Sequence, residues 1–539
     1  MSLQPKSQNA YHASTSSTEW RWVIVISIVI VVLVSIPLLF ATYTDSRNPN
    51  VSFMGAVYNP FDGGTYLSKI QLGREGFWRT YFRHSPNADE GAYLDLFYTG
   101  LGHVASPLGL TNIMALHAAR LLAAIGMCLA LYYLGATIWR RTRNRRLFFI
   151  WVMVGSGFGW ILVFFGVETA PDLVVPESFP LFSAMTNAHF AIAFALVALS
   201  AAVVIRVFRP GFEGEPAVAN GGLTLFISSL ILSLIAPHVL VPFVLGLGLL
   251  IVINGVNKRR LDFNHLRWVM IIVLPAIPAA LYYLAELRYN PVVANWSAQN
   301  LTPTPLPWLF LAGYGLPLIC ALPGLYRAVR RFEPDGDQFM LLWLIAILVM
   351  VYFPTDTQRR FAFAIMIPIT YFAVRTLDDL LFLGTPNRRQ NRIAGALVVF
   401  SSLTYILQMI IGLTSVSVTN DPRFYLHQDY VAAFDWIDAR TDGTDVVLAS
   451  PVVGLWLPGQ SGVRVVYGHP YETINATENL ALVNGWYAAD QVTDPVCDGL
   501  LAEYNITHVL IGPHEDASTA CTDALENVQT FGEVTIYAP

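Results

Sequence analysis

The chain has 539 residues, of which 55% are hydrophobic and only 13% are charged, and its mean hydropathy is +0.51. A soluble globular protein carries about 25% charged residues, so this composition excludes a soluble fold and indicates a protein embedded in a bilayer. The formal net charge of -5 indicates no class of partner by itself, and the chain lacks a basic stripe of the kind that binds nucleic acid.

The first apolar segment, residues 22–41, has the length of about 20 residues that a helix needs to span a bilayer. It is longer than the core of a cleavable signal peptide, so we interpret it as an uncleaved anchor. Two later segments are short and meet at Pro237–His238, which predicts a helical hairpin; one long tilted helix is the alternative. The sequence thus predicts eleven spans, at 22–41, 111–139, 147–166, 184–207, 223–236, 239–256, 268–287, 306–328, 338–354, 361–383 and 392–413.

Positive charge predicts the orientation of these spans. With the N-terminus in the cytoplasm, 20 of the 32 Lys and Arg residues fall on the cytoplasmic side, as the positive-inside bias requires. The short external loops then hold only Arg288, Arg359 and Arg360, and eleven spans place the C-terminus outside. The cytoplasmic set is Lys6, Arg21, Arg140, Arg141, Arg143, Arg145, Arg146, Arg206, Arg209, Lys258, Arg259, Arg260, Arg267, Arg327, Arg330, Arg331, Arg375, Arg388, Arg389 and Arg392.

Two larger segments are external in this topology. We expect a transmembrane domain over 1–413, with a first external loop at 42–110, and an extracytoplasmic α/β domain over 414–539. In the tail, Cys497 and Cys521 can pair once exported. Its pattern predicts a helix at 430–440 and strands at 445–450, 463–467, 506–512 and 534–537.

The first external loop carries a candidate catalytic acid. Asp62 precedes Gly63–Gly64, and the apolar residues that follow recur at helical spacing. This pattern predicts an amphipathic helix lying in the membrane interface, with Asp62 at its N-terminal end. Asp62 is therefore either a functional carboxylate or only the N-cap of that helix. Asp89 and Glu90, further along the loop, suit a solvated loop or hard oxygen ligands for a divalent ion.

A short external turn late in the membrane domain carries Gln358, Arg359 and Arg360. Two adjacent guanidinium groups on this side run against the prevailing charge bias, and Arg suits bidentate phosphate binding. The alternative is a pair of side chains that contact lipid headgroups. We expect a clamp for a lipid-linked phosphate, because headgroup anchoring would not select this side.

Other polar residues are predicted near the same membrane surface. Asn187 and His189 begin the fourth span, His238 lies at the tip of the hairpin, and Arg120 lies in the outer third of the second span. Ionisable residues within spans usually face the protein interior and mark a site, although a hydrogen-bonded structural role suits each histidine alone. Glu168, Asp172 and Glu177 fit an ordinary solvated loop equally well.

The chain has no Gly-rich phosphate loop, no Cys/His zinc spacing and no nucleophile elbow.

Its pattern resembles the GT-C superfamily of membrane glycosyltransferases, which includes protein O-mannosyltransferases and aminoarabinose transferases. The resemblance covers about 1–413 and rests on an acid in a long first external loop, an interfacial helix after it and an Arg-bearing late turn. The family's Asp-Glu pair is absent, since the sequence reads Asp62–Gly63.

This resemblance implies transfer of a sugar from a polyprenyl-phosphate carrier to an acceptor glycan, lipid or protein on the outer face, with inversion at the anomeric carbon. Asp62 would deprotonate or orient the acceptor hydroxyl, and Arg359 and Arg360 would hold the carrier phosphate. A divalent cation, Mg or Mn, would involve Asp62, Asp89 and Glu90. The first rival interpretation is a transporter or flippase for a lipid-linked or anionic substrate; the second is an inert membrane platform with an external binding domain.

Overall fold

The computed structural model describes residues 15–87, 89–209, 220–259, 263–334, 336–492, 494–515 and 519–539. Within the predicted cytoplasmic cations, Lys6 and Arg260 lie outside these ranges. The chain forms two compact units, each assembled from separate stretches of sequence. Unit 1 comprises 1–34, 120–282 and 302–409, and unit 2 comprises 35–119, 283–301 and 410–539.

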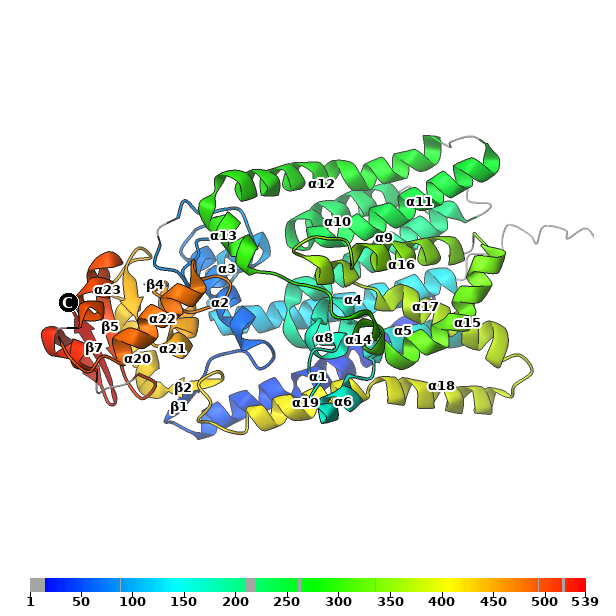
Figure 1. The fold of residues 1–539 in the computed structure, drawn as a ribbon. Helices are drawn as coiled ribbons and strands as arrows, with labels where there is room; N and C mark the ends of the chain where they lie inside the picture. Colours follow the sequence, from blue (N-terminus) through cyan, green and yellow to red (C-terminus); the bar gives the residue numbers. More distant parts are fainter. Residues whose placement is uncertain are drawn as a thin grey trace, which may run out of the picture. The chain divides into compact units, whose positions relative to one another are not determined.

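Unit 1 is helical, and its helices follow the eleven predicted segments. α9 and α10 pack side by side, as do α15 and α17 (Figure 1). Four of the helices, α1, α4, α12 and α19, contribute residues to both units. The helices are α1 (Ser17–Arg47), α4 (Asn112–Ile138), α5 (Thr142–Val154), α6 (Gly159–Leu162), α7 (Pro171–Val174), α8 (Pro180–Thr186), α9 (Ala188–Phe208), α10 (Gly221–Ile235), α11 (Leu240–Lys258), α12 (Phe263–Tyr289), α14 (Pro307–Ala312), α15 (Gly315–Arg331), α16 (Asp337–Met350), α17 (Met366–Thr376), α18 (Asn387–Ser401) and α19 (Leu403–Ser415).

Length and hydropathy support fewer certain spans than the eleven predicted. Among the described residues, seven helices are long and apolar enough to cross a membrane, or eight if the bent pair α18–α19 is one span. α10 and α16 are shorter apolar helices. The predicted segment at 306–328 is interrupted between α14 and α15, where Gly315 has a φ of +36°. The predicted hairpin is confirmed as separate helices, because α10 ends at Ile235 and a 3-10 turn at Pro237–Val239 leads into α11.

Several predicted cytoplasmic arginines are ion-paired inside unit 1. Arg145 is buried and its Nη1 lies 3.1 Å from Glu19 Oε1, which also accepts the Tyr132 hydroxyl. Asp337 is fully buried, and its carboxylate pairs with Arg327 at 2.9 Å and Arg375 at 3.2 Å. These charges are satisfied within the helical bundle, as buried charges must be.

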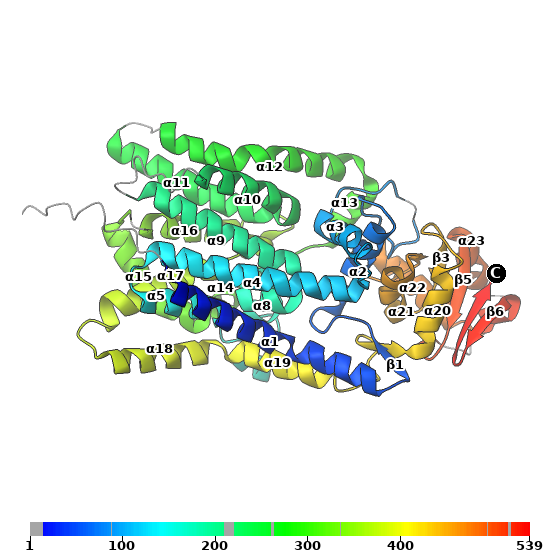
Figure 2. The ribbon, with the colours of Figure 1, turned by 180° about the vertical axis from the view of Figure 1, so that it is seen from behind.

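Unit 2 contains a five-stranded sheet in the order β4-β3-β5-β7-β6. β3 pairs in parallel with β4 and β5, whereas β7 pairs antiparallel with β5 and β6. The helix α20 packs against β6 and β7 (Figure 2). The elements of the tail are β2 (Tyr425–His427), α20 (Gln428–Asp438), β3 (Val446–Leu448), α21 (Pro451–Ser461), β4 (Arg464–Val465), α22 (Ala476–Tyr487), α23 (Pro495–Glu503), β5 (Ile506–Ile511), β6 (Glu526–Phe531) and β7 (Val534–Ala538).

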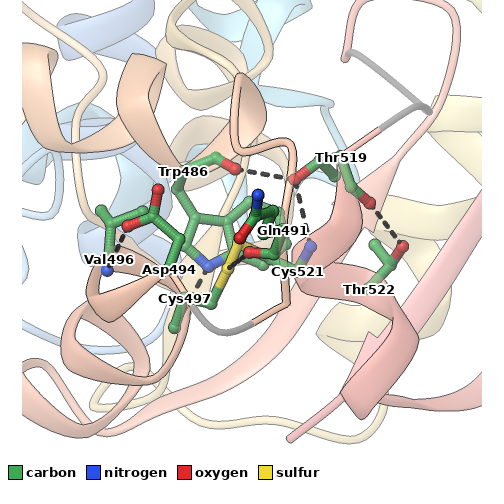
Figure 3. Close-up of a disulfide and its surroundings, with 8 residues drawn as sticks. All are labelled: Trp486, Gln491, Asp494, Val496, Cys497, Thr519, Cys521 and Thr522. Atoms are coloured by element: carbon green, nitrogen blue, oxygen red, sulfur yellow. Dashed lines mark hydrogen bonds between the residues drawn. A yellow bond between two sulfur atoms is a disulfide. The ribbon is translucent and has the colours of Figure 1, made fainter.

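The predicted helix and the four predicted strands of the tail are confirmed, while β2, β6 and three helices were not anticipated. Cys497 and Cys521, whose pairing the sequence left open, form a disulfide that ties the start of α23 to the segment before β6 (Figure 3). Beside it, the Trp486 indole donates to the Cys497 carbonyl at 3.3 Å, and the Thr519 hydroxyl donates to the Trp486 carbonyl at 2.8 Å. Cys128 and Cys320 are free.

The first predicted external loop belongs to unit 2 together with the tail. β1 (Val51–Phe53) pairs antiparallel with β2, and α2 (Pro60–Arg74) packs against both α3 (Leu96–Ala105) and α21. One hydrophobic core includes residues from α2, α3, α20, α21 and the sheet. The compact unit therefore combines residues from the predicted 42–110 and 414–539 segments.

Candidate functional site

Asp62 lies in the first turn of α2, three residues after Asn59. Asn59 is the N-cap and has a left-handed φ of 53°, and it caps no backbone amide with its side chain. The side-chain amide nitrogen of Asn59, Nδ2, instead donates to Asp62 Oδ2 at 2.6 Å. The interpretation of Asp62 as the N-cap is therefore wrong. A carboxylate in the first turn of a helix is favoured by the helix dipole, and Asn59 fixes its orientation.

Close packing explains the two glycines that follow Asp62. A Cβ at Gly63 would lie 2.5 Å from Ala56 Cβ, and a Cβ at Gly64 would lie 2.7 Å from the Leu455 carbonyl oxygen. Neither position accepts a side chain without displacement of its neighbour. The Asp-Glu pair of the GT-C family does not fit at positions 62 and 63 of this chain, because the side chain of a glutamate at position 63 would overlap Ala56.

The predicted helix after Asp62 is confirmed, but its amphipathic character is wrong. Buried residues occur all around α2, because α3 and α21 cover it within unit 2. Gly73 and Gly102 permit the close crossing of α2 and α3, since a Cβ on Gly73 would lie 1.9 Å from the Thr99 carbonyl oxygen. The sequence pattern failed here because the polar face of the helix is buried against the tail.

Lys69 is the charged residue on that buried face. Its Nζ lies 2.6 Å from Glu472 Oε1 and 2.7 Å from Asp95 Oδ2. Burial alone would lower the pKa of Lys69, but Asp95 and Glu472 outweigh it and hold the pKa above its ordinary range. Burial would raise the pKa of Glu472, but Lys69 and His84 hold it well below its ordinary range. The pair is charged, and it joins α2 to the turn at 468–473.

The turn at 468–473 contains His469, which is buried like His84. Its Nδ1 accepts hydrogen bonds from the amides of Tyr471 and Glu472, both at 3.1 Å. Burial lowers the pKa of His469 to about 3, so the ring is uncharged. The spacing of residues in the sequence does not connect this turn with Lys69.

The predicted metal ligands Asp62, Asp89 and Glu90 do not gather. Asp89 Oδ2 accepts the Phe82 amide at 3.1 Å and lies 3.4 Å from Arg464 Nη1, while Asp89 Oδ1 accepts the Gly91 amide at 2.8 Å. Glu90 is exposed. No three His, Cys, Asp or Glu residues within the described ranges are grouped as a metal site requires. Asp89 therefore serves a structural ion pair, and the residues present do not fit the predicted ion.

The Arg-bearing turn belongs to unit 1 and forms the 3-10 helix η6 (Gln358–Ala362). The Arg359 amide donates to the Thr302 carbonyl at 2.9 Å, and Gln358 Oε1 accepts the Thr304 amide at 3.3 Å. Gln358 thus anchors the turn. Among the residues that the structure describes, none accepts a hydrogen bond from the buried Arg359 Nε.

Polar side chains from other elements of unit 1 lie near this turn. η6 packs against the 3-10 turn η5 (Pro237–Val239), and the His238 ring lies 5.9 Å from Phe363 between centroids. Arg360 and His189 lie within electrostatic range of His238. In this part of the described chain, His238 Nε2 and Asn187 Nδ2 are buried without a hydrogen-bond partner, as is Arg359 Nε. Unit 1 therefore brings His238, His189 and the arginine turn together.

Arg120 has a structural contact in unit 1. It is 2% exposed, and its Nη1 donates to the Ala184 carbonyl at 2.6 Å, in the helix that precedes Asn187. This contact holds the start of α9, where Asn187 and His189 lie. Arg120 therefore supports the position of those residues.

Asp172 is a buried acid, so the alternative of an ordinary solvated residue is wrong for it. Its Oδ2 accepts the amides of Gly157 and Gly159 at 3.0 Å each and the Thr404 hydroxyl at 2.6 Å. Burial raises the pKa of Asp172 to about 6, against those hydrogen bonds. Glu177 is also buried, and its carbonyl accepts the amide of Ala364, whose φ is +59°. The loop from Asp172 to Glu177 therefore supports the end of the arginine turn.

Comparison with known proteins places this fold. No protein-family model and no curated protein matches the sequence. The oligosaccharyltransferase of Archaeoglobus fulgidus, tethered to an acceptor peptide containing the NVT sequon, superposes with a TM-score of 0.55 and 14% identity over 92% of this chain and 69% of that chain. The same enzyme in complex with Zn and sulfate gives 0.51 and 13% identity over 91% of this chain and 68% of that chain.

ArnT from Cupriavidus metallidurans, bound to undecaprenyl phosphate, superposes with a TM-score of 0.52 and 15% identity over 97% of this chain and 98% of that chain. Both enzymes are GT-C membrane glycosyltransferases. The predicted GT-C fold is therefore confirmed, and the chain is an integral membrane protein with a sheet-containing C-terminal region. At these identities the likeness concerns the fold alone.

Proposed function

We propose that this protein transfers a sugar from a polyprenyl-phosphate carrier to an acceptor hydroxyl on the extracytoplasmic face of a membrane. The observation that carries the proposal is a set of buried polar atoms, Arg359 Nε, His238 Nε2 and Asn187 Nδ2, that lack hydrogen-bond partners among the described residues, in a chain with a GT-C fold. Guanidinium and amide N–H groups suit an anion such as the carrier phosphate. ArnT, which has the same fold, binds undecaprenyl phosphate.

The orientation of the chain is part of this proposal. A disulfide forms and persists in oxidising compartments, so the Cys497–Cys521 bond supports an extracytoplasmic tail. The charge bias of the sequence supports a cytoplasmic N-terminus. Asp62 and the tail belong to the same compact unit. An extracytoplasmic tail therefore places the Asp62 carboxylate on the extracytoplasmic side as well.

The residues take separate roles in the proposed reaction. Arg359 and Arg360 hold the phosphate and stabilise the negative charge that grows on it as the bond to the anomeric carbon breaks. Asp62 accepts the proton of the acceptor hydroxyl as the hydroxyl oxygen bonds to that carbon. A single displacement of this kind inverts the anomeric configuration. Since Asp89 is bound to Arg464, no step is assigned to a divalent ion.

A transfer assay tests this function. Purified protein in liposomes is given polyprenyl-phosphate sugars and membrane extracts as acceptors, and mass spectrometry follows the sugar. Transfer by the wild type, with a loss of about 100-fold or more in Asp62→Asn, supports the proposal. Movement of the labelled lipid between leaflets without any sugar transfer would favour the transporter instead. Absence of both activities would favour the inert platform.

A further inference from the structure

The buried ring of His469 in unit 2 carries an N–H group without a hydrogen-bond partner among the described residues. His469 is 3% exposed, and its Nδ1 accepts two backbone amides. Because the ring is uncharged and Nδ1 carries no proton, the single ring proton is on Nε2. Among the described residues, none accepts a hydrogen bond from that atom. A buried unpaired donor is costly, so its persistence points to a ligand.

Two exposed aromatic rings lie beside the His469 ring. Phe61 and Tyr471 are each 44% exposed, and their centroids lie 6.1 Å and 5.7 Å from that of His469, at interplanar angles of 71° and 64°. Phe61 directly precedes Asp62 in the first turn of α2. Nε2 is itself buried, and exposed side chains such as these two rings change rotamer readily.

The turn that carries His469 is held by hydrogen bonds, and its charged residue is paired within the protein. The Thr473 hydroxyl accepts the His469 amide at 3.1 Å and donates to the His84 carbonyl at 2.6 Å. The His84 Nε2 contacts the Leu455 carbonyl at 3.0 Å. Glu472 is paired with Lys69. The charges of the turn are thus used within the protein, and what faces a ligand is one neutral donor and two aromatic surfaces.

We propose that Phe61, His469 and Tyr471 form a subsite for a pyranose ring beside Asp62. A pyranose offers an apolar C–H face to an aromatic ring and hydroxyl and ring oxygens to a single N–H donor, and it carries no charge. Lys69 is already paired with Glu472 and Asp95, so it offers no free charge to a ligand such as phosphate. This inference rests on the proposed glycosyl transfer, and the pyranose belongs either to the lipid-linked donor or to the acceptor.

Ligand-observed saturation-transfer NMR on the full-length protein in nanodiscs tests the subsite directly, with methyl mannoside, glucoside and galactoside as probes. His469→Asn keeps an acceptor at the Nδ1 position and removes the Nε2–H donor, while Phe61→Leu and Tyr471→Leu remove the aromatic surfaces. Phe77→Leu is the matched control, because Phe77 is 43% exposed in the same unit. We expect all three subsite variants to lose saturation about fivefold and the control to retain it.

Kinetics then identify the source of the ring: a raised KM for the lipid-linked donor assigns it to the donor, and a raised KM for the acceptor assigns it to the acceptor. Binding is measured apart from turnover, so the two proposals fail separately. Pyranoside binding without any transfer would contradict only the glycosyltransferase proposal. Lack of binding by the wild type, equal binding by all variants, or displacement of pyranosides by a neutral peptide would overturn the subsite.

Discussion

Removal of the Lys69 charge should destabilise α2 strongly, because the ammonium group holds two carboxylates. Lys69→Met leaves Glu472, whose side chain is 8% exposed, and Asp95 without their cation. Loss of one partner of a buried ion pair costs about 3–5 kcal/mol. At about 1.4 kcal/mol per tenfold change, the amides of α2 should exchange their hydrogens at least about 100-fold faster if opening of α2 limits exchange.

The pH dependence of the same variant has a defined sign. In the wild type, the lowered pKa of Glu472 contributes stability that is complete above its unfolded value of about 4.3 and is lost as the pH falls below it. The raised pKa of Lys69 contributes stability that is complete below about 10.4 and is lost as the pH rises above it. Stability from the pair is therefore flat between about pH 5 and 9.

In Lys69→Met the sign at low pH reverses. Burial then raises the pKa of Glu472 with only His84 and His469 to oppose it, so protonation of Glu472 stabilises α2 as the pH is lowered from 7 to 5. Hydrogen-exchange mass spectrometry of peptides within 60–74 measures both effects. Arg423→Met is the control, since the Arg423 side chain is 57% exposed in its pair with Asp421 and should change stability by less than about 1 kcal/mol. Equal exchange in the two variants would refute the reasoning.

Three other perturbations test separate parts of the structure. Gly63→Ala should lower the thermal unfolding temperature because its Cβ overlaps Ala56, whereas Gly499→Ala, with nothing within 4 Å of its Cβ, should not; equal melting temperatures would contradict the packing. Replacing Cys497 and Cys521 by Ser opens a loop with a sequence separation of 24 and should destabilise the tail by about 3 kcal/mol, seen as faster exchange in β5 and β6; unchanged exchange would argue against it. The raised pKa of Asp172, about 6, makes wild-type stability fall as the pH rises from about 4 to 6; Asp172→Asn should flatten this dependence in a melting series, and an unchanged slope would assign it elsewhere.

Much of the fold followed from short-range patterns in the sequence. Apolar segments located the helices of unit 1, and β-branched runs bounded by turn residues located β3, β4, β5 and β7. β6 was missed because its sequence, Glu526 to Phe531, is polar and mostly exposed, as an edge strand often is. Strands with so few apolar residues leave little signal for periodicity.

The candidate site was only partly accessible to sequence reasoning. Asp62 and Arg359 stood out because a carboxylate before two glycines and paired arginines against the charge bias are local signals. Lys69 and Glu472 are 403 positions apart, and their pairing depends on tertiary packing that no spacing reveals. The burial of Asp172 could not be predicted because its partners are two backbone amides, of Gly157 and Gly159, and the hydroxyl of the distant Thr404.

The central claim is that Asp62 and Arg359 serve sugar transfer from a polyprenyl-phosphate donor. The most direct measurement is the single-turnover rate of sugar transfer in liposomes for the wild type, Asp62→Asn and Arg359→Gln. Glu90→Gln and Arg288→Gln are the controls, because both residues are exposed and are predicted on the same side. We expect the single-turnover rate to fall by about 100-fold or more in the two site variants and to stay at the wild-type value in both controls. Wild-type transfer by folded Asp62→Asn and Arg359→Gln proteins would contradict it.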